Sequence, residues 1–414
     1  MKTDRHRRTS AGSRTATALM RVGALGLTGF LAVLIGAPPA AASVPLAPPV
    51  ADKVRDEQWQ LSALHAEAAW RISTGAGVTV AVIDSGVDAT HPDLAGQVLG
   101  GRDLVDSAGD GYDDEVGHGT TVAALIAGRG DDARGVVGLA PGAKILPVRV
   151  LDSRNLYEDD RVVADAVRWS VDHGADVINL SLGGAVDSAA LADAIDYAFE
   201  RDVVVVACTG NTDPEKQNEV WYPAREPGVL AVTGLAHRGD SPLWTGSITG
   251  SATVLSAPAN DLLGATPGGY WRVEGTSFAA PLVAATAALV RARWPEMSAA
   301  NVVNRLIKTA RDLGPAGRDS SYGFGEVDPV AALTDTVAEV RANPLDNVPP
   351  PGKATFSRAT GLPAAPLQKS TEKAPFDRNH PDVEVSLPAG LTMVILLMGT
   401  SSAILRRRHD WSVQ

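Results

Sequence analysis

The sequence predicts an α/β fold in which a doubly wound parallel sheet carries helices on both faces. Four short runs of apolar and β-branched residues have the pattern of strands buried on both faces, and they span 78–83, 145–150, 177–182 and 203–207. Helical patterns separate these runs, at 120–127, 161–172 and 191–199. Because strands alternate with helices, a parallel sheet is expected.

The composition is that of a globular chain. It has 414 residues, of which 45% are hydrophobic and 21% charged, values that exclude intrinsic disorder and a multi-span membrane protein. The formal net charge of −11 argues against nucleic acid as a partner. Cys208 is the only cysteine, so no disulfide forms within the chain.

Residues 1–42 have the order of a secretory signal peptide. Six basic residues and one acidic residue precede an uncharged, mostly apolar stretch at 22–37, and the small residues Ala40, Ala41 and Ala42 follow. We therefore expect cleavage near Ala42 by the general secretion route, the alternative being an uncleaved membrane anchor. Cleavage takes away a net charge of +5, so the net charge of −11 becomes −16.

The carboxyl-terminal part predicts a stalk and one membrane span. Residues 343–386 are rich in proline and polar residues, as in an extended linker. Residues 387–405 carry no charge and precede Arg406, Arg407 and Arg408, so we expect a transmembrane helix with residues 406–414 as its cytoplasmic tail. A buried core helix and a cell-wall sorting signal are the alternatives.

Three residues are expected at the carboxyl edge of the sheet, where active sites of such folds lie. Asp84 follows the first strand, His118 stands between two glycines before a helix, and Ser277 opens an apolar helix that runs to Val290. Taken singly, each has an ordinary structural explanation: a buried aspartate, a histidine that caps a helix and an N-cap serine. Together they supply a hydroxyl nucleophile, a base and a carboxylate that orients the base.

A fourth residue completes this set. Asn211 follows the strand at 203–207, and its side-chain amide is placed to donate to an oxyanion beside the backbone N–H of Ser277. The sequence thus predicts Asp84, His118 and Ser277 as the catalytic residues, with Asn211 and Ser277 as the oxyanion hole.

These segments resemble the signature motifs of the subtilisin-like serine proteases, in that family's chain order. The motifs read Asp84-Ser85-Gly86, Gly117-His118-Gly119-Thr120, Gly210-Asn211 and Gly275-Thr276-Ser277. The resemblance covers 75–332 and implies a serine endopeptidase that acts on protein or peptide substrates. It also implies two walls of the primary specificity pocket: one of Ser181, Leu182, Gly183 and Gly184, which pairs with a bound peptide, and one that includes Cys208, Thr209 and Gly210.

Within that family the layout is most similar to the mycosins, membrane-anchored proteases of type VII secretion systems. The shared features are the signal peptide, the extension at 43–74, the catalytic domain at 75–342, the linker, the span and the basic tail. The resemblance implies a single-pass protein of the cell membrane with its catalytic domain outside and with type VII membrane components as partners. Unlike many mycosins, this chain has no cysteine pair.

The extension at 43–74 is too short for a folded inhibitory prodomain once the signal peptide is removed. We expect it to run along the protease surface, anchored by Trp59, Leu61 and Trp70, and to require no autocatalytic removal. No cofactor is predicted. The acidic segment 110–115 could bind calcium, but its spacing matches no calcium-binding loop, so a solvated acidic loop is favoured.

Two functions therefore remain open. One is an active endopeptidase that cleaves exported proteins outside the membrane, and the other is a mainly structural, non-proteolytic subunit that stabilises a secretion complex. The presence of all four predicted catalytic groups favours retained chemistry.

Overall fold

A computed structural model describes residues 53–106, 109–130, 134–214, 218–237 and 242–346. The signal peptide, most of the proline-rich linker, the membrane span and the cytoplasmic tail predicted from the sequence lie outside these ranges. Within them, no helix is long and apolar enough to cross a bilayer.

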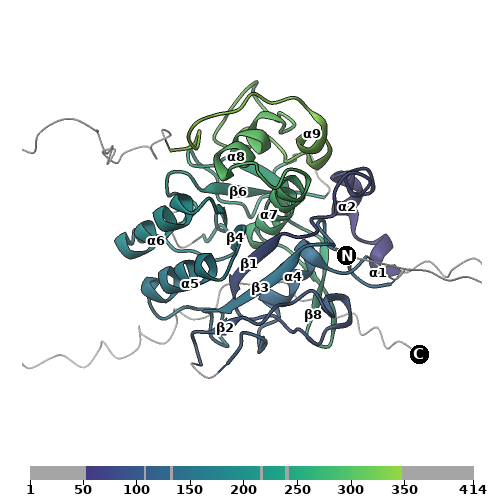
Figure 1. Cartoon of the computed structure of the whole chain (residues 1–414), viewed down its shortest axis with the longest axis vertical. Coiled ribbons are helices and arrows are strands. Elements are labelled where there is room, and N and C mark those ends of the chain that lie inside the picture. Colours follow the sequence, from purple (N-terminus) through teal and green to yellow (C-terminus); the bar gives the residue numbers. More distant parts are fainter. Residues whose placement is uncertain (1–52, 107–108, 131–133, 215–217, 238–241, 347–414) are drawn as a thin grey trace, which may run out of the picture. The chain divides into compact units, whose positions relative to one another are not determined.

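The centre of the fold is a seven-stranded parallel sheet with the order β2-β3-β1-β4-β5-β6-β7 (Figure 1). Its strands are β1 (Thr79–Asp84), β2 (Arg102–Asp103), β3 (Lys144–Arg149), β4 (Val177–Leu180), β5 (Val204–Cys208), β6 (Leu230–Leu235) and β7 (Leu255–Pro258). All six strand pairs are parallel, so the carboxyl ends of the strands lie along one edge.

Helices cover both faces of this sheet, as the sequence predicts. α4 (His118–Ala127) packs against α7 (Thr276–Arg293) on one face, and α5 (Asp160–Asp172) packs against α6 (Ala189–Glu200) on the other (Figure 1). α7 packs against β1, β4, β5, β6 and β7 and is buried along nearly its whole length, because alanine and other small residues let it lie close to the sheet.

The four strands expected from the sequence are all present, with ends shifted by at most two residues. β6, β7 and the antiparallel hairpin of β8 (Leu262–Thr266) and β9 (Gly269–Val273) were not predicted. Glycine or proline lies in each of these strands, at Gly234, Pro258, Gly264 and Gly269. These residues interrupt the β-branched pattern that identifies a strand.

The described chain ends with α8 (Ala299–Lys308), α9 (Pro329–Thr334) and a segment that continues to residue 346. Asn343 donates a hydrogen bond to the carbonyl of Gly228 at 2.9 Å, and Leu345 is buried in the core. The packed body thus continues three residues past the expected boundary at 342, because Leu345, at the start of the proline-rich stretch, is buried in the core.

The extension before the catalytic body forms three short helices, α1 (Lys53–Asp56), α2 (Trp59–Ala63) and α3 (Ala66–Trp70). The expected anchors are confirmed for this part of the extension. Trp59, Leu61 and Trp70 pack against the core, and the two indole N–H groups donate to the carbonyls of Asn260 at 3.1 Å and Leu139 at 2.9 Å. The extension therefore runs along the protein surface and is packed against the catalytic body.

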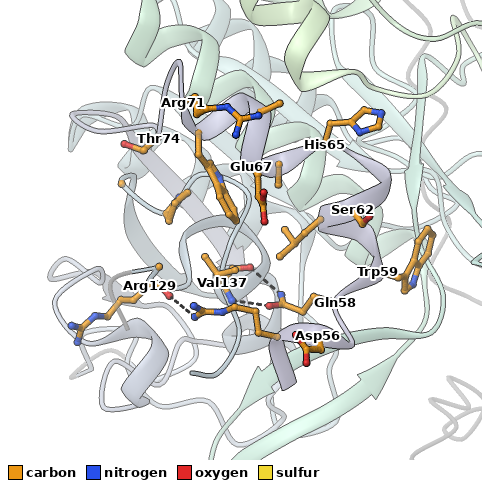
Figure 2. Close-up of a pocket in the computed structure, with 18 of the residues that line it drawn as sticks. Asp56, Gln58, Trp59, Ser62, His65, Glu67, Arg71, Thr74, Arg129 and Val137 are labelled. Atoms are coloured by element: carbon orange, nitrogen blue, oxygen red, sulfur yellow. Dashed lines mark hydrogen bonds between the residues drawn. The ribbon is translucent and has the colours of Figure 1, made fainter. Parts of the chain in front are cut away.

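A large cavity lies between this extension and the body, with a volume of about 1190 Å³ (Figure 2). Gln58 closes one side of it, since its side-chain amide accepts from the N–H of Val137 and donates to the carbonyl of the same residue, both at 2.9 Å. None of the predicted catalytic residues lines this cavity.

The buried Gln58 is expected to hold the extension in place. Gln58→Ala leaves the N–H and carbonyl of Val137 without their partners, so we predict a loss of about 2 kcal/mol in the free energy of unfolding, measured in denaturant. Glu67→Ala, at an exposed position of α3, is the matched control and should change it by less than about 0.5 kcal/mol. Equal effects of the two substitutions would contradict this role.

Candidate active site

Asp84 is the last residue of β1 and lies at the carboxyl edge of the sheet, fully buried. Its Oδ1 accepts a hydrogen bond from the N–H of Ser85 at 2.8 Å and is 2.6 Å from Nδ1 of His118. Its Oδ2 has no hydrogen-bond partner among the described residues. The structure thus brings together the carboxylate and the imidazole that the sequence pairs across 34 positions.

His118 is the first residue of α4, and two glycines fix its approach to β1. Gly117 has a φ of 81°, which lets the chain turn into the helix. Gly119 faces β1 so closely that a Cβ there would lie 2.1 Å from the carbonyl oxygen of Gly86 and 3.1 Å from Cβ of Asp84. Only glycine at this position allows the helix to start against the strand.

The segment before His118 is held by the buried carboxylate of Asp114. One oxygen accepts from the hydroxyl of Ser85 and from the N–H of Gly117, both at 2.8 Å, and the other accepts from Thr120. The expected solvated acidic loop is therefore wrong for this residue. Its carboxylate caps the first turn of α4, where unpaired N–H groups and the positive end of the helix dipole favour an anion.

The neighbouring acidic residues pair with Arg149 at the end of β3. The guanidinium of Arg149 lies 3.1 Å from Glu115, 3.4 Å from Asp113 and 3.1 Å from the buried Asp103. These contacts fasten the acidic segment to the sheet. Among the described residues, no group of three histidine, cysteine or acidic side chains is arranged to hold a metal ion.

The pKa of His118 is raised above its ordinary value of 6.5. Burial acts against the protonated ring, but the charge of Asp84, its hydrogen bond and the charge of Asp114 outweigh that effect. The two carboxylates thus make the imidazole a stronger base and stabilise the imidazolium that forms when it accepts a proton.

Ser277 is the second residue of α7, next to the helix N-terminus. Pro281 lies four residues later and has no N–H, so the carbonyl of Ser277 lacks its helical partner. The hydroxyl of Ser181 donates to that carbonyl at 2.6 Å and accepts from the amide of Asn179 at 2.9 Å. The side chain of Ser181 therefore positions the segment that bears Ser277.

The hydroxyl of Ser277 faces Cys208, with Oγ 3.9 Å from Sγ. Within the described residues, no hydrogen bond joins this hydroxyl to His118, although the imidazole packs against the ring of Phe278 at 5.1 Å between centroids. Rotation about one side-chain bond redirects a serine hydroxyl. Hydrogen bonds of this kind often tighten only when substrate binds.

Asn211 is fixed by Thr276 so that its amide nitrogen is free to donate. The N–H and the hydroxyl of Thr276 both donate to Oδ1 of Asn211 at 3.0 Å. In a side-chain amide only the oxygen accepts a hydrogen bond, so the backbone N–H of Thr276 must face Oδ1 of Asn211. This contact assigns the orientation of the amide and turns Nδ2 away from Thr276. Thr276 was not predicted as a functional residue, although it stands between Gly275 and Ser277 in the motif.

The predicted specificity segments follow neighbouring strands. β4 ends at Leu180, so Ser181–Gly184 leave the sheet as a loop, and Gly184 pairs with Tyr222 through two hydrogen bonds of 2.9 and 2.8 Å. On the other side, Cys208 and Thr209 are fully buried. Burial raises the pKa of the Cys208 thiol to about 11, so this side chain remains a small neutral group.

Comparison with known proteins now identifies the family. A model of the subtilase family, peptidase S8, matches residues 75–325. The chain belongs to the subtilase family. It is 37% identical to subtilisin DY of Bacillus licheniformis over 62% of this chain and 91% of that protein. It is also 37% identical to fervidolysin of Fervidobacterium pennivorans over 68% of this chain, but spans only 44% of fervidolysin.

Similar solved structures include two mycosins. MycP1 with its N-terminal propeptide removed shares 33% identity and a TM-score of 0.60, over 68% of this chain and 98% of that one. MycP3, a protease from the type VII (ESX-3) secretion system, shares 33% identity and a TM-score of 0.58, over 71% and 91%. The resemblance noted in the sequence is confirmed, and the chain is a subtilase-family serine peptidase.

The close approach at Gly119 gives a first test of this site. Gly119→Ala places a methyl group against the backbone of Gly86, so the contact between α4 and β1 must open. We predict a loss of about 10² in kcat for peptide hydrolysis, since a displacement of about 1 Å at a catalytic group has that effect. Gly100→Ala, at a glycine with no atom within 4 Å of the added methyl, should leave kcat unchanged, and similar losses in both variants would contradict the account.

The raised pKa of His118 predicts the pH dependence of hydrolysis. The imidazole must be neutral to accept a proton, so kcat/KM should fall as pH drops through a pKa that lies above 6.5. Asp114→Asn removes one of the charges that raise this pKa and should move the acid limb to lower pH. Asp165→Asn on the exposed face of α5 serves as the control. An acid limb that does not move in Asp114→Asn would contradict this electrostatic assignment.

Proposed function

We propose that this subtilase is a membrane-anchored extracellular serine endopeptidase that works through Asp84, His118 and Ser277. The observation that carries the proposal is the buried hydrogen bond of 2.6 Å between Asp84 and His118, beside the N-terminal turn of α7 that bears Ser277. Two independent structural devices support it: the close packing at Gly119 and the amide of Asn211 anchored by Thr276.

The proposed reaction begins with attack of the Ser277 hydroxyl on a peptide carbonyl. His118 accepts the hydroxyl proton through Nε2, while Asp84 holds Nδ1 and stabilises the imidazolium. The imidazolium then protonates the leaving amine, which departs as the C–N bond breaks and leaves an acyl group on Ser277. Water, deprotonated by His118, releases the acyl group and restores the hydroxyl.

When Ser277 attacks, negative charge develops on the carbonyl oxygen of the substrate, next to the N-terminus of α7. The N–H of Ser277 and Nδ2 of Asn211 are the proposed donors, since the amide oxygen of Asn211 is held by Thr276. Donors fixed before the reaction need no reorganisation as the charge forms. The helix dipole adds to the same effect.

Association with type VII secretion is the finer part of the proposal. Its support is the similarity to MycP1 and MycP3, together with the sequence order of signal peptide, protease, proline-rich linker, apolar stretch and basic tail. In this arrangement the protease lies outside the cell, one helix at 387–405 anchors it, and type VII membrane components are its partners.

A role in proteolysis can be separated from a mainly structural role. Ser277→Ala keeps the fold and the membrane anchor but removes the nucleophile, so a deletion strain complemented with this variant should not release the processed forms of exported proteins. Full restoration of both secretion and processing would contradict the proposed peptidase function, and restored secretion without processing would show that export itself needs only the structural contribution.

Asn211→Ala tests the oxyanion hole. We predict a fall of about 10²–10³ in kcat with little change in KM, because the amide acts on the transition state more than on bound substrate. The measurement is steady-state hydrolysis of a short peptide. A rise in KM with unchanged kcat would place Asn211 in substrate binding instead.

A further inference from the structure

The segment that follows residue 220 crosses between the two predicted walls of the specificity pocket. From its position we propose that Trp221 forms the floor of this pocket and restricts the residue before the scissile bond to glycine, alanine or serine. This inference deepens the proposed function and rests on it, since it assigns the substrate class of the same site.

The two walls leave the sheet from neighbouring strands. β4 and β5 are paired in parallel, with Leu180 opposite Ala207. Their continuations, 182–184 and 209–210, therefore start side by side at the edge that carries Ser277. A substrate side chain next to the attacked carbonyl has to enter between these two segments.

Trp221 and Tyr222 tie the two walls together. The N–H of Trp221 donates to the carbonyl of Thr209 at 3.0 Å, on one wall. Tyr222 exchanges two backbone hydrogen bonds with Gly184, on the other wall. This segment thus closes the space between the walls at its far end.

The indole lies directly against one wall. A Cβ built on Gly210 would stand 2.4 Å from Cδ2 and 2.6 Å from Cε2 of Trp221, much closer than atoms can approach. On the opposite wall, a Cβ on Gly183 would stand 3.2 Å from Cβ of Trp221 and 2.4 Å from the carbonyl oxygen of Tyr222. Gly210 thus leaves room for the indole, and Gly183 leaves room for the main chain and Cβ of the crossing segment. The indole therefore fills space beside Gly210 that a substrate side chain would otherwise enter.

The surrounding contacts prevent the walls from moving apart. The N–H of Gly210 donates to the hydroxyl of Thr276 at 3.1 Å, and its carbonyl accepts from Ile248 at 3.0 Å. Arg225 donates its N–H to the carbonyl of Trp221 at 2.9 Å. With both backbone groups of Trp221 bonded and the wall at Gly210 fixed, a large substrate side chain meets a rigid floor.

The test compares peptides that differ only in the residue before the scissile bond, alanine or phenylalanine. For the full-length chain we expect kcat/KM to favour alanine by at least about tenfold, and Trp221→Ala to raise the relative rate for phenylalanine by about 10- to 100-fold. Trp221→Phe, which keeps a large ring, should retain most of the preference. Trp169→Ala, on the outer helix α5, removes a partly buried tryptophan away from this edge and should leave the ratio unchanged.

The outcomes separate the two proposals. A wild-type chain that cleaves the phenylalanine peptide as fast as the alanine peptide overturns the role of Trp221 and leaves the peptidase function intact, and this measurement needs no variant to fold. A Trp221→Ala chain that cleaves the alanine peptide normally with an unchanged ratio overturns the role in the same way. A wild-type chain that hydrolyses neither these peptides nor peptides with glycine or serine at that position contradicts the proposed function itself.

Discussion

The candidate site depends on one contact, the hydrogen bond of 2.6 Å between the carboxylate of Asp84 and the imidazole of His118. A carboxylate and a ring that are both buried have lost much of their hydration, which is unfavourable unless each compensates the other. At the edge of the sheet, β1 supplies the carboxylate and the first turn of α4 supplies the ring. The remaining features of this edge keep these two elements at the required distance.

The support for α4 extends to the β8–β9 hairpin, which packs directly against it. Thr121 donates its hydroxyl to the carbonyl of Ala265 at 2.7 Å, which joins α4 to the β8–β9 hairpin. The hairpin is in turn linked to the extension, because Arg272 of β9 forms an ion pair with Glu57 and the indole of Trp59 donates to the carbonyl of Asn260, just before β8. The extension, the hairpin and the helix that bears His118 therefore form one continuous packed layer, which is why a short N-terminal segment can be a structural part of a peptidase.

Much of this arrangement could be predicted from sequence because it is encoded locally. Continuous β-branched runs identify the buried strands, and the positions of Asp84 and His118 follow from the strand and helix ends beside them. The role of Pro281 was not predicted, because it depends on Ser181 reaching a carbonyl that the proline leaves unpaired from 96 positions away. Asp114 was misinterpreted for a similar reason: an acidic segment gives no sign of which carboxylate folds inward to cap a helix. The contact of Trp221 with the glycines of two distant walls depends on tertiary packing that no local pattern records.

The most direct test of the central claim is to map where a fluorophosphonate probe attaches and how fast. The account predicts a single adduct on Ser277, with a labelling rate that falls by about 10³-fold or more in His118→Ala, since the hydroxyl then has no base to take its proton. An adduct on another serine, or a rate that His118→Ala leaves unchanged, would contradict the proposed cooperation of Asp84, His118 and Ser277.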